Sequence, residues 1–157
     1  MIQRIQSIWL FLAAVVIFAL FLFPYMQYAD SSGTGYALKV AGTFGNVDGQ
    51  PTRVSNSWLL TLATVLIGLF PLYIVFLFKD RKKQIRMSYL SIVSVLLLGV
   101  WFYLNINATL TAAGLPFALQ YIGVGFFLLP VVIILLFMAI GAIKRDEKLI
   151  RSADRLR

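Results

Sequence analysis

The chain has 157 residues, of which 61% are hydrophobic and only 13% are charged. An ordinary soluble domain carries about 25% charged residues, and one of this size could not bury so much apolar surface, so the composition indicates a single-domain membrane protein. The lack of Cys and His excludes disulfides, thiolate and Ser-His catalysis, and the usual zinc, iron–sulfur and His-ligated haem sites. We therefore expect no cofactor, no metal site and no enzymatic activity.

The positive charges gather in a few places. Of the 14 Lys and Arg residues, Arg4 precedes the first apolar run, five lie in the loop 79–86 and six lie in the tail 144–157. This distribution follows the positive-inside rule, by which short cytoplasmic segments hold the Lys and Arg. It predicts a multi-pass protein with both termini in the cytoplasm. Without interleaved exposed aromatics or a recognisable binding fold, these charges do not favour a nucleic-acid partner.

Four apolar segments predict transmembrane helices, at residues 8–26, 58–78, 88–104 and 117–143. The first segment could instead be a signal peptide, because Ala29-Asp30-Ser31 loosely fits a cleavage site, but its length favours a retained helix. Pro71 and Pro130 predict kinks in the second and fourth helices. Together the segments predict an all-α membrane protein, an antiparallel up-down bundle of four transmembrane helices in one domain, residues 1–157.

Residues 30–57 form the only sizeable polar segment between the apolar runs. They contain several glycines, Asp48-Gly49 is a turn dipeptide, and residues 36–41 alternate weakly between apolar and polar. We expect a small extracytoplasmic loop or β-hairpin here, with an irregular loop as the alternative.

Small and hydroxyl-bearing residues recur at spacings of three or four in two of the predicted helices. Such residues let neighbouring helices approach closely. They are candidates for helix packing: Thr61, Thr64, Gly68, Ser91 and Ser94.

The two ends of the chain resemble a known family. The opening Met1-Ile2-Gln3-Arg4-Ile5-Gln6-Ser7 leads into an apolar run, and the charged ending spans residues 142–157. Together they resemble the bacterial domain-of-unknown-function family numbered four-two-nine-three, which is made of small four-span inner-membrane proteins. The resemblance implies a four-helix fold in a bacterial inner (cytoplasmic) membrane and no particular activity. It also makes part of the tail a candidate partner-binding surface: Asp146, Glu147, Arg151, Asp154 and Arg155. The alternative is that these charges solvate the last helix and suit its dipole.

Two main functions remain open. The first is an accessory or scaffolding subunit of a larger membrane assembly, with membrane lipid and other inner-membrane proteins as partners. The second is a small transporter or channel for a neutral or lipidic solute, which would need a polar cavity between the second, third and fourth helices. Recognition of anionic lipid by the basic face is a third hypothesis, since each Lys or Arg near such a surface adds about 1 kcal/mol.

Overall fold

A computed structural model of the chain describes residues 3–30, 33–47, 50–78 and 80–154. One helix, four strands and then the remaining helices follow one another along the chain: α1 (Gln3–Ala19), β1 (Met26–Ala29), β2 (Gly35–Lys39), β3 (Gly42–Val47), β4 (Gln50–Asn56), α2 (Trp58–Phe76), α3 (Arg81–Ala112), the short 3₁₀ helix η1 (Leu119–Tyr121) and α4 (Val124–Asp154).

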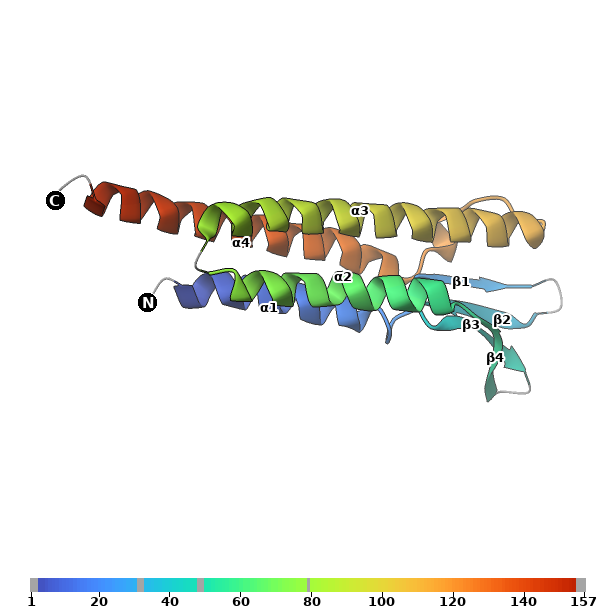
Figure 1. The fold of residues 1–157 in the computed structure, drawn as a ribbon. Helices are drawn as coiled ribbons and strands as arrows, with labels where there is room; N and C mark the ends of the chain where they lie inside the picture. Colours follow the sequence, from blue (N-terminus) through green and yellow to red (C-terminus); the bar gives the residue numbers. More distant parts are fainter. Residues whose placement is uncertain (1–2, 31–32, 48–49, 79, 155–157) are drawn as a thin grey trace.

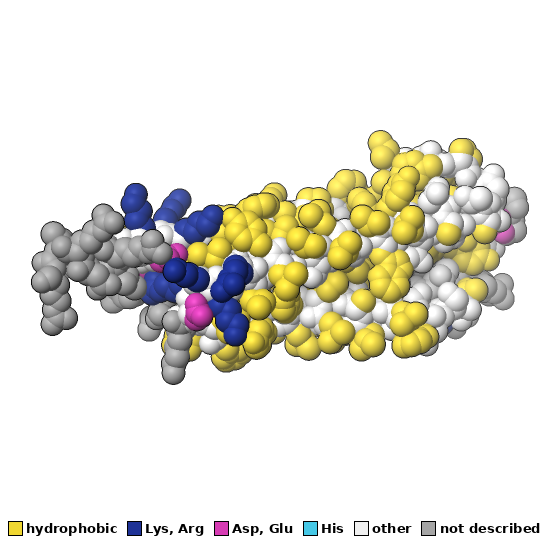
Figure 2. Space-filling view, turned by 45° about the horizontal axis from the view of Figure 1, so that its top comes forward, with side chains coloured by type: hydrophobic (Ala, Val, Ile, Leu, Met, Phe, Trp, Pro, Cys, Tyr) yellow, Lys and Arg dark blue, Asp and Glu magenta, His cyan; other side chains and the backbone are white. Residues whose placement is uncertain are grey.

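The four long helices lie side by side and alternate in direction (Figure 1). The sheet lies at one end, and the start of α1 and the end of α4 lie at the other. Helix α1 packs against α2 and α4, and α3 packs against the same two helices. The core between them consists of fully buried side chains such as Leu10, Ile17, Leu98, Phe102 and Leu136. Apolar side chains also cover the outside of the helices (Figure 2), as a lipid-facing surface requires.

Three helices in the described part of the chain, α2, α3 and α4, are long and apolar enough to cross a membrane. The prediction of four transmembrane helices is therefore wrong, because α1 is a shorter apolar helix of 17 residues. The physical reason is Pro24, which has no amide hydrogen and disfavours helical geometry in the residue before it. Helix α1 ends at Ala19, tight turns follow as far as Phe23, and Pro24 prevents a return to helix, so Met26, the last residue of the apolar run 8–26, begins a strand.

The all-α prediction is also wrong, because a four-stranded antiparallel sheet lies between α1 and α2, where the sequence predicts a loop or a hairpin. The strands form a meander in the order β1-β2-β3-β4. Met26 and Leu38, which are cross-strand neighbours, are buried, whereas Gln27 beside them is exposed. This alternation is a strand pattern, but in strands of four to seven residues that contain several glycines it is too short to be conspicuous. The predicted turn at Asp48-Gly49 lies outside the described residues.

The start of α4 is fastened to the segment that leads into β1. The amides of Gly123 and Gly125 donate to the carbonyls of Tyr25 and Pro24, both at 2.9 Å. The two segments approach so closely that a Cβ on Gly123 would lie 2.2 Å from the Pro24 carbonyl oxygen. The Tyr25 ring stacks on Phe102 of α3 with 4.4 Å between centroids. This junction holds the sheet against the ends of two helices.

The charged segments at the other end are helical over most of their length. Helix α3 begins at Arg81, so most of the expected basic loop 79–86 forms its first turns. Asp80 caps it, because a side-chain oxygen of Asp80 accepts a hydrogen bond from the Lys83 amide at 3.1 Å. Helix α4 continues through the charged tail to Asp154 and projects beyond the ends of its neighbours (Figure 1).

Candidate functional site at the basic end

Lys and Arg side chains gather at the end of the molecule opposite the sheet (Figure 2). The described ones come from the start of α3 and from α4, namely Arg81, Lys82, Lys83, Arg86, Lys144, Arg145 and Lys148. Most are exposed, and Lys144 donates to the Tyr89 hydroxyl at 2.9 Å. This basic end is the strongest feature of charge in the structure, and it encloses one buried acid.

The buried acid is Asp146 of α4, only 6% exposed. One of its side-chain oxygens, Oδ2, lies 2.6 Å from Nη1 of Arg81 at the start of α3. The same oxygen accepts a hydrogen bond of 2.7 Å from Nε2 of Gln6 in α1, a residue that is also buried. One carboxylate thus joins three helices, and we call Gln6, Arg81 and Asp146 the polar clasp.

Arg81 and Asp146 are held together by the attraction of opposite charges more than by a well-aligned hydrogen bond. Although the Arg81 nitrogen is close to Asp146, its N–H bonds do not point at the oxygen well enough to count as a hydrogen bond. The attraction is still strong, because the Asp146 side chain is 9% exposed and a charge pair with little water around it is weakly screened. An unpaired carboxylate at this depth would be costly, so Arg81 and Gln6 compensate the burial of Asp146.

A second buried polar layer lies one helical turn further along α3. Gln84 donates from Nε2 to the carbonyl of Ile74 near the end of α2, at 3.2 Å. Ser88 in turn donates to the Gln84 carbonyl at 2.9 Å. The side-chain oxygen of Gln84 finds no partner within the described residues. The clasp and this layer together link all four long helices through polar side chains at the basic end.

The structure places the five predicted partner-binding residues differently from one another. Asp146 points into the protein and belongs to the clasp. Glu147 is half-buried and has an interaction of its own. Arg151 and Asp154 lie in the last turns of α4, where only the backbone is described, and Arg155 lies outside the described residues.

The predicted helix-packing residues lie within or beside the core. Thr64 is fully buried and its hydroxyl donates to the Leu60 carbonyl of its own helix at 2.8 Å, while Thr61 also reaches the Val40 carbonyl beside the sheet at 3.1 Å. Gly68 lies against the Phe18 ring of α1, so closely that a Cβ would meet it at 3.0 Å.

The two serines on α3 differ from each other. Ser94 donates to the Leu90 carbonyl at 3.0 Å, whereas the fully buried Ser91 hydroxyl has no partner among the described residues.

The sequence interpretation did not single out Gln6, Arg81 or Gln84 as a site. A signal for part of the set was present, because Gln84, Ser88 and Ser91 recur at spacings of four and three and therefore share one face of α3. Gln6 carried no such signal, since its partner lies 140 residues away in the sequence. Within the described residues, no three acidic, His or Cys side chains come together in a way that could hold a metal ion.

The comparison with protein families matches almost the whole chain. A family model described as "Domain of unknown function (DUF4293)" covers residues 2–156. The chain belongs to this family. The resemblance of the two termini is thereby confirmed, and a DUF4293 chain is seen to combine apolar helices of membrane-spanning length with a sheet and a basic end. A comparison with curated proteins found no match.

Proposed function

We propose that this DUF4293 protein is a non-catalytic accessory or scaffolding subunit of a larger assembly in a bacterial inner membrane. The observation that carries the proposal is the projection of α4 beyond the other helices at the basic end (Figure 1). A helix that extends past its own bundle has a surface for another protein, and the sequence of this one is charged. The clasp at its base supports the same role, because it holds α4 in one direction relative to α1 and α3.

The proposed orientation places the basic end, with both termini, in the cytoplasm and the sheet outside. Helix α1 is shorter than the other three helices, but it runs from the basic end toward the sheet (Figure 1), and the segment 20–25 that follows it completes this passage. The orientation rests on the positive-inside rule, because twelve of the 14 Lys and Arg residues belong to the opening, the segment 79–86 and the tail, which all lie at the basic end of the predicted topology. Reporter fusions test it. A fluorescent protein should be active at both termini and alkaline phosphatase at neither, whereas termini on opposite sides would overturn the orientation.

Capture of partners tests the scaffolding role. The full chain, extracted in a mild detergent, should co-purify with a defined set of membrane proteins identified by mass spectrometry. A tail variant with Arg151→Gln, Asp154→Asn and Arg155→Gln should lose them. Its net charge falls by one, since two positive charges and one negative charge are removed.

The matched control is Lys82→Gln, which also lowers the net charge by one and changes an exposed residue of the same basic end. It should retain the partners. Recovery of the wild-type chain alone, under conditions that preserve other complexes, would refute the proposed function, and equal capture by the tail variant would refute the assignment to α4.

A further inference from the structure

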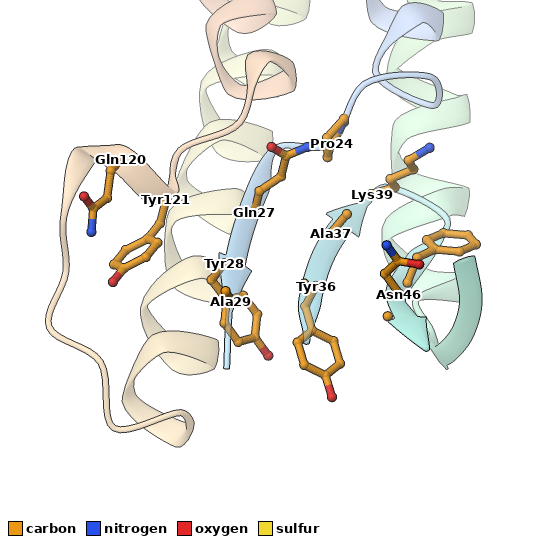
Figure 3. Close-up of a pocket in the computed structure, with 13 residues that line it drawn as sticks. Pro24, Gln27, Tyr28, Ala29, Tyr36, Ala37, Lys39, Asn46, Gln120 and Tyr121 are labelled. Carbon is orange, nitrogen blue, oxygen red and sulfur yellow. The ribbon is translucent and has the colours of Figure 1, made fainter. Parts of the chain in front are cut away.

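A cleft of about 930 Å³ lies over the outer face of the sheet, at the end of the molecule away from the polar clasp. Strands β1, β2 and β3 and helix η1 supply its lining. Figure 3 shows Gln120 and Tyr121 of η1 standing beside β1, with Asn46 of β3 on the opposite side. The volume is at the upper end of the roughly 300–1,000 Å³ of small-molecule sites.

The cleft is hollow because small residues occupy the outward positions of two strands. Ala29 lies opposite Gly35 in the sheet register, and Gln27 lies opposite Ala37. These residues alternate with the inward-facing Met26 and Leu38, so they line the outer face. Three neighbouring positions without a large side chain leave a floor that larger residues surround.

The surrounding side chains are mostly amides and aromatic rings. The side-chain amides of Gln27, Asn46 and Gln120 make no hydrogen bond to any other part of the described chain, so their donors and acceptors are available to a ligand. Tyr28 and Tyr36 stack on each other with 5.2 Å between ring centroids, but they occupy the same alternate strand positions as Met26 and Leu38, so they border the cleft from the inner face.

Two other classes of ligand fit less well. An extended peptide would gain its hydrogen bonds from the free edge of a strand, but the cleft lies over the face of the sheet. An anionic lipid headgroup would favour several cations, and Lys39 is the one charged side chain in this lining. Its ammonium already lies over the Phe44 ring, 5.6 Å from the centroid.

We propose that the outer face of the sheet binds a short saccharide, such as a glycan segment outside the membrane. Sugar hydroxyls both donate and accept hydrogen bonds, which suits the three side-chain amides, and the C–H face of a sugar ring can pack on an aromatic ring such as that of Tyr121 at the side of the cleft. Lys39 at one edge would tolerate a sugar with an acidic substituent. The site is independent of any partner at the basic end, so the two proposals can fail separately.

Calorimetric titration of the purified full chain tests the proposal. The protein is kept in a zwitterionic detergent without a sugar headgroup, and the probes are the tetramer of N-acetylglucosamine and a glucose tetramer. At least one tetramer should bind with a dissociation constant below about 1 mM. Ala37→Leu, which fills the floor, should weaken binding at least tenfold, and Gln120→Ala should weaken it several-fold through the loss of one hydrogen bond.

The control is Ser55→Leu, an equal gain of apolar volume on exposed β4, outside the cleft. It should bind as the wild type does, and thermal unfolding establishes that each variant is folded. Failure of both tetramers to bind the wild-type chain would overturn the proposal, and so would unchanged binding by folded Ala37→Leu. Vesicles with anionic lipid that displace the sugar and depend on Lys39 would assign the cleft to a headgroup instead.

Discussion

Replacement of Asp146 is the most direct test of how the helices are held together. Asp146→Leu removes the carboxylate from the polar clasp while keeping a side chain of similar size. It leaves the Arg81 guanidinium without its counter-charge and the Gln6 amide without its acceptor. The variant Asp146→Asn separates the two losses, because its side-chain oxygen can still accept from Gln6 but carries no charge.

The structure sets the size of the expected effect. Breaking a buried ion pair by removing one partner costs about 3–5 kcal/mol. Arg81 keeps 21% of its side chain exposed, so water can partly solvate it, and we expect the lower value of about 3 kcal/mol for Asp146→Leu. At roughly 2–4 °C per kcal/mol for a chain of this length, the midpoint of thermal unfolding should fall by about 6–12 °C. Asp146→Asn should lie between this variant and the wild type.

A double-mutant cycle distinguishes the clasp from a local defect in α4. Arg81→Leu combined with Asp146→Leu removes both charges, and it should recover most of the stability because an apolar pair is often as stable as a buried ion pair. Lys148→Leu, at an exposed position on the same helix, should change the free energy of unfolding by less than about 0.5 kcal/mol. The reasoning is refuted if Asp146→Leu is no less stable than Lys148→Leu, or if the two clasp substitutions are additive.

Three further predictions concern the junction and the core. Gly123→Ala should cost about 1–3 kcal/mol by overpacking against a backbone carbonyl, whereas Gly141→Ala, with open space around it, should be neutral or stabilising; equal unfolding midpoints would contradict this. Burial raises the pKa of Tyr25 to about 12, so the stability that its neutral hydroxyl contributes is complete below pH 10 and is lost between about pH 10 and 12. Tyr25→Phe should remove the last step of the tyrosinate absorbance titration and should make the free energy of unfolding less dependent on pH in this range. Ser91→Ala, which removes an unpartnered buried hydroxyl, should leave the unfolding midpoint unchanged or raise it, whereas a fall would show that Ser91 has a partner.

Hydropathy predicted the helices well where the chain is uniformly apolar and poorly where it turns. Helices α2 and α4 contain long uncharged stretches, and their existence follows from composition. The sheet does not follow in the same way, because β1 begins within an apolar run and its alternation is visible over only four residues. The effect of Pro24 on the preceding residue was the available signal for the end of α1, since it makes a helix up to Met26 unfavourable.

The polar clasp shows a second limit. The charge distribution predicted that Arg81 and Asp146 lie on the same side of the membrane, but many pairings were possible among the charges predicted for that side. The pairing depends on how α3 and α4 are rotated about their axes. The sequence does not reveal this rotation, because the lipid-facing and core-facing side chains of a membrane helix are equally apolar. The opening of the chain was recognised by its resemblance, yet the role of Gln6 became visible only from its contact.

The position of the clasp connects stability with the proposed partner surface. Asp146 lies two turns before the end of α4 at Asp154, so it is near the point where the helix leaves its neighbours. A projecting helix keeps one direction only if its base is held, and the clasp holds it against both α1 and α3. Asp146→Asn should therefore reduce partner capture even though no residue of the projecting turns is changed, and the double leucine variant should restore capture together with stability. If capture instead follows the charge of the tail alone, the clasp stabilises the fold without orienting α4.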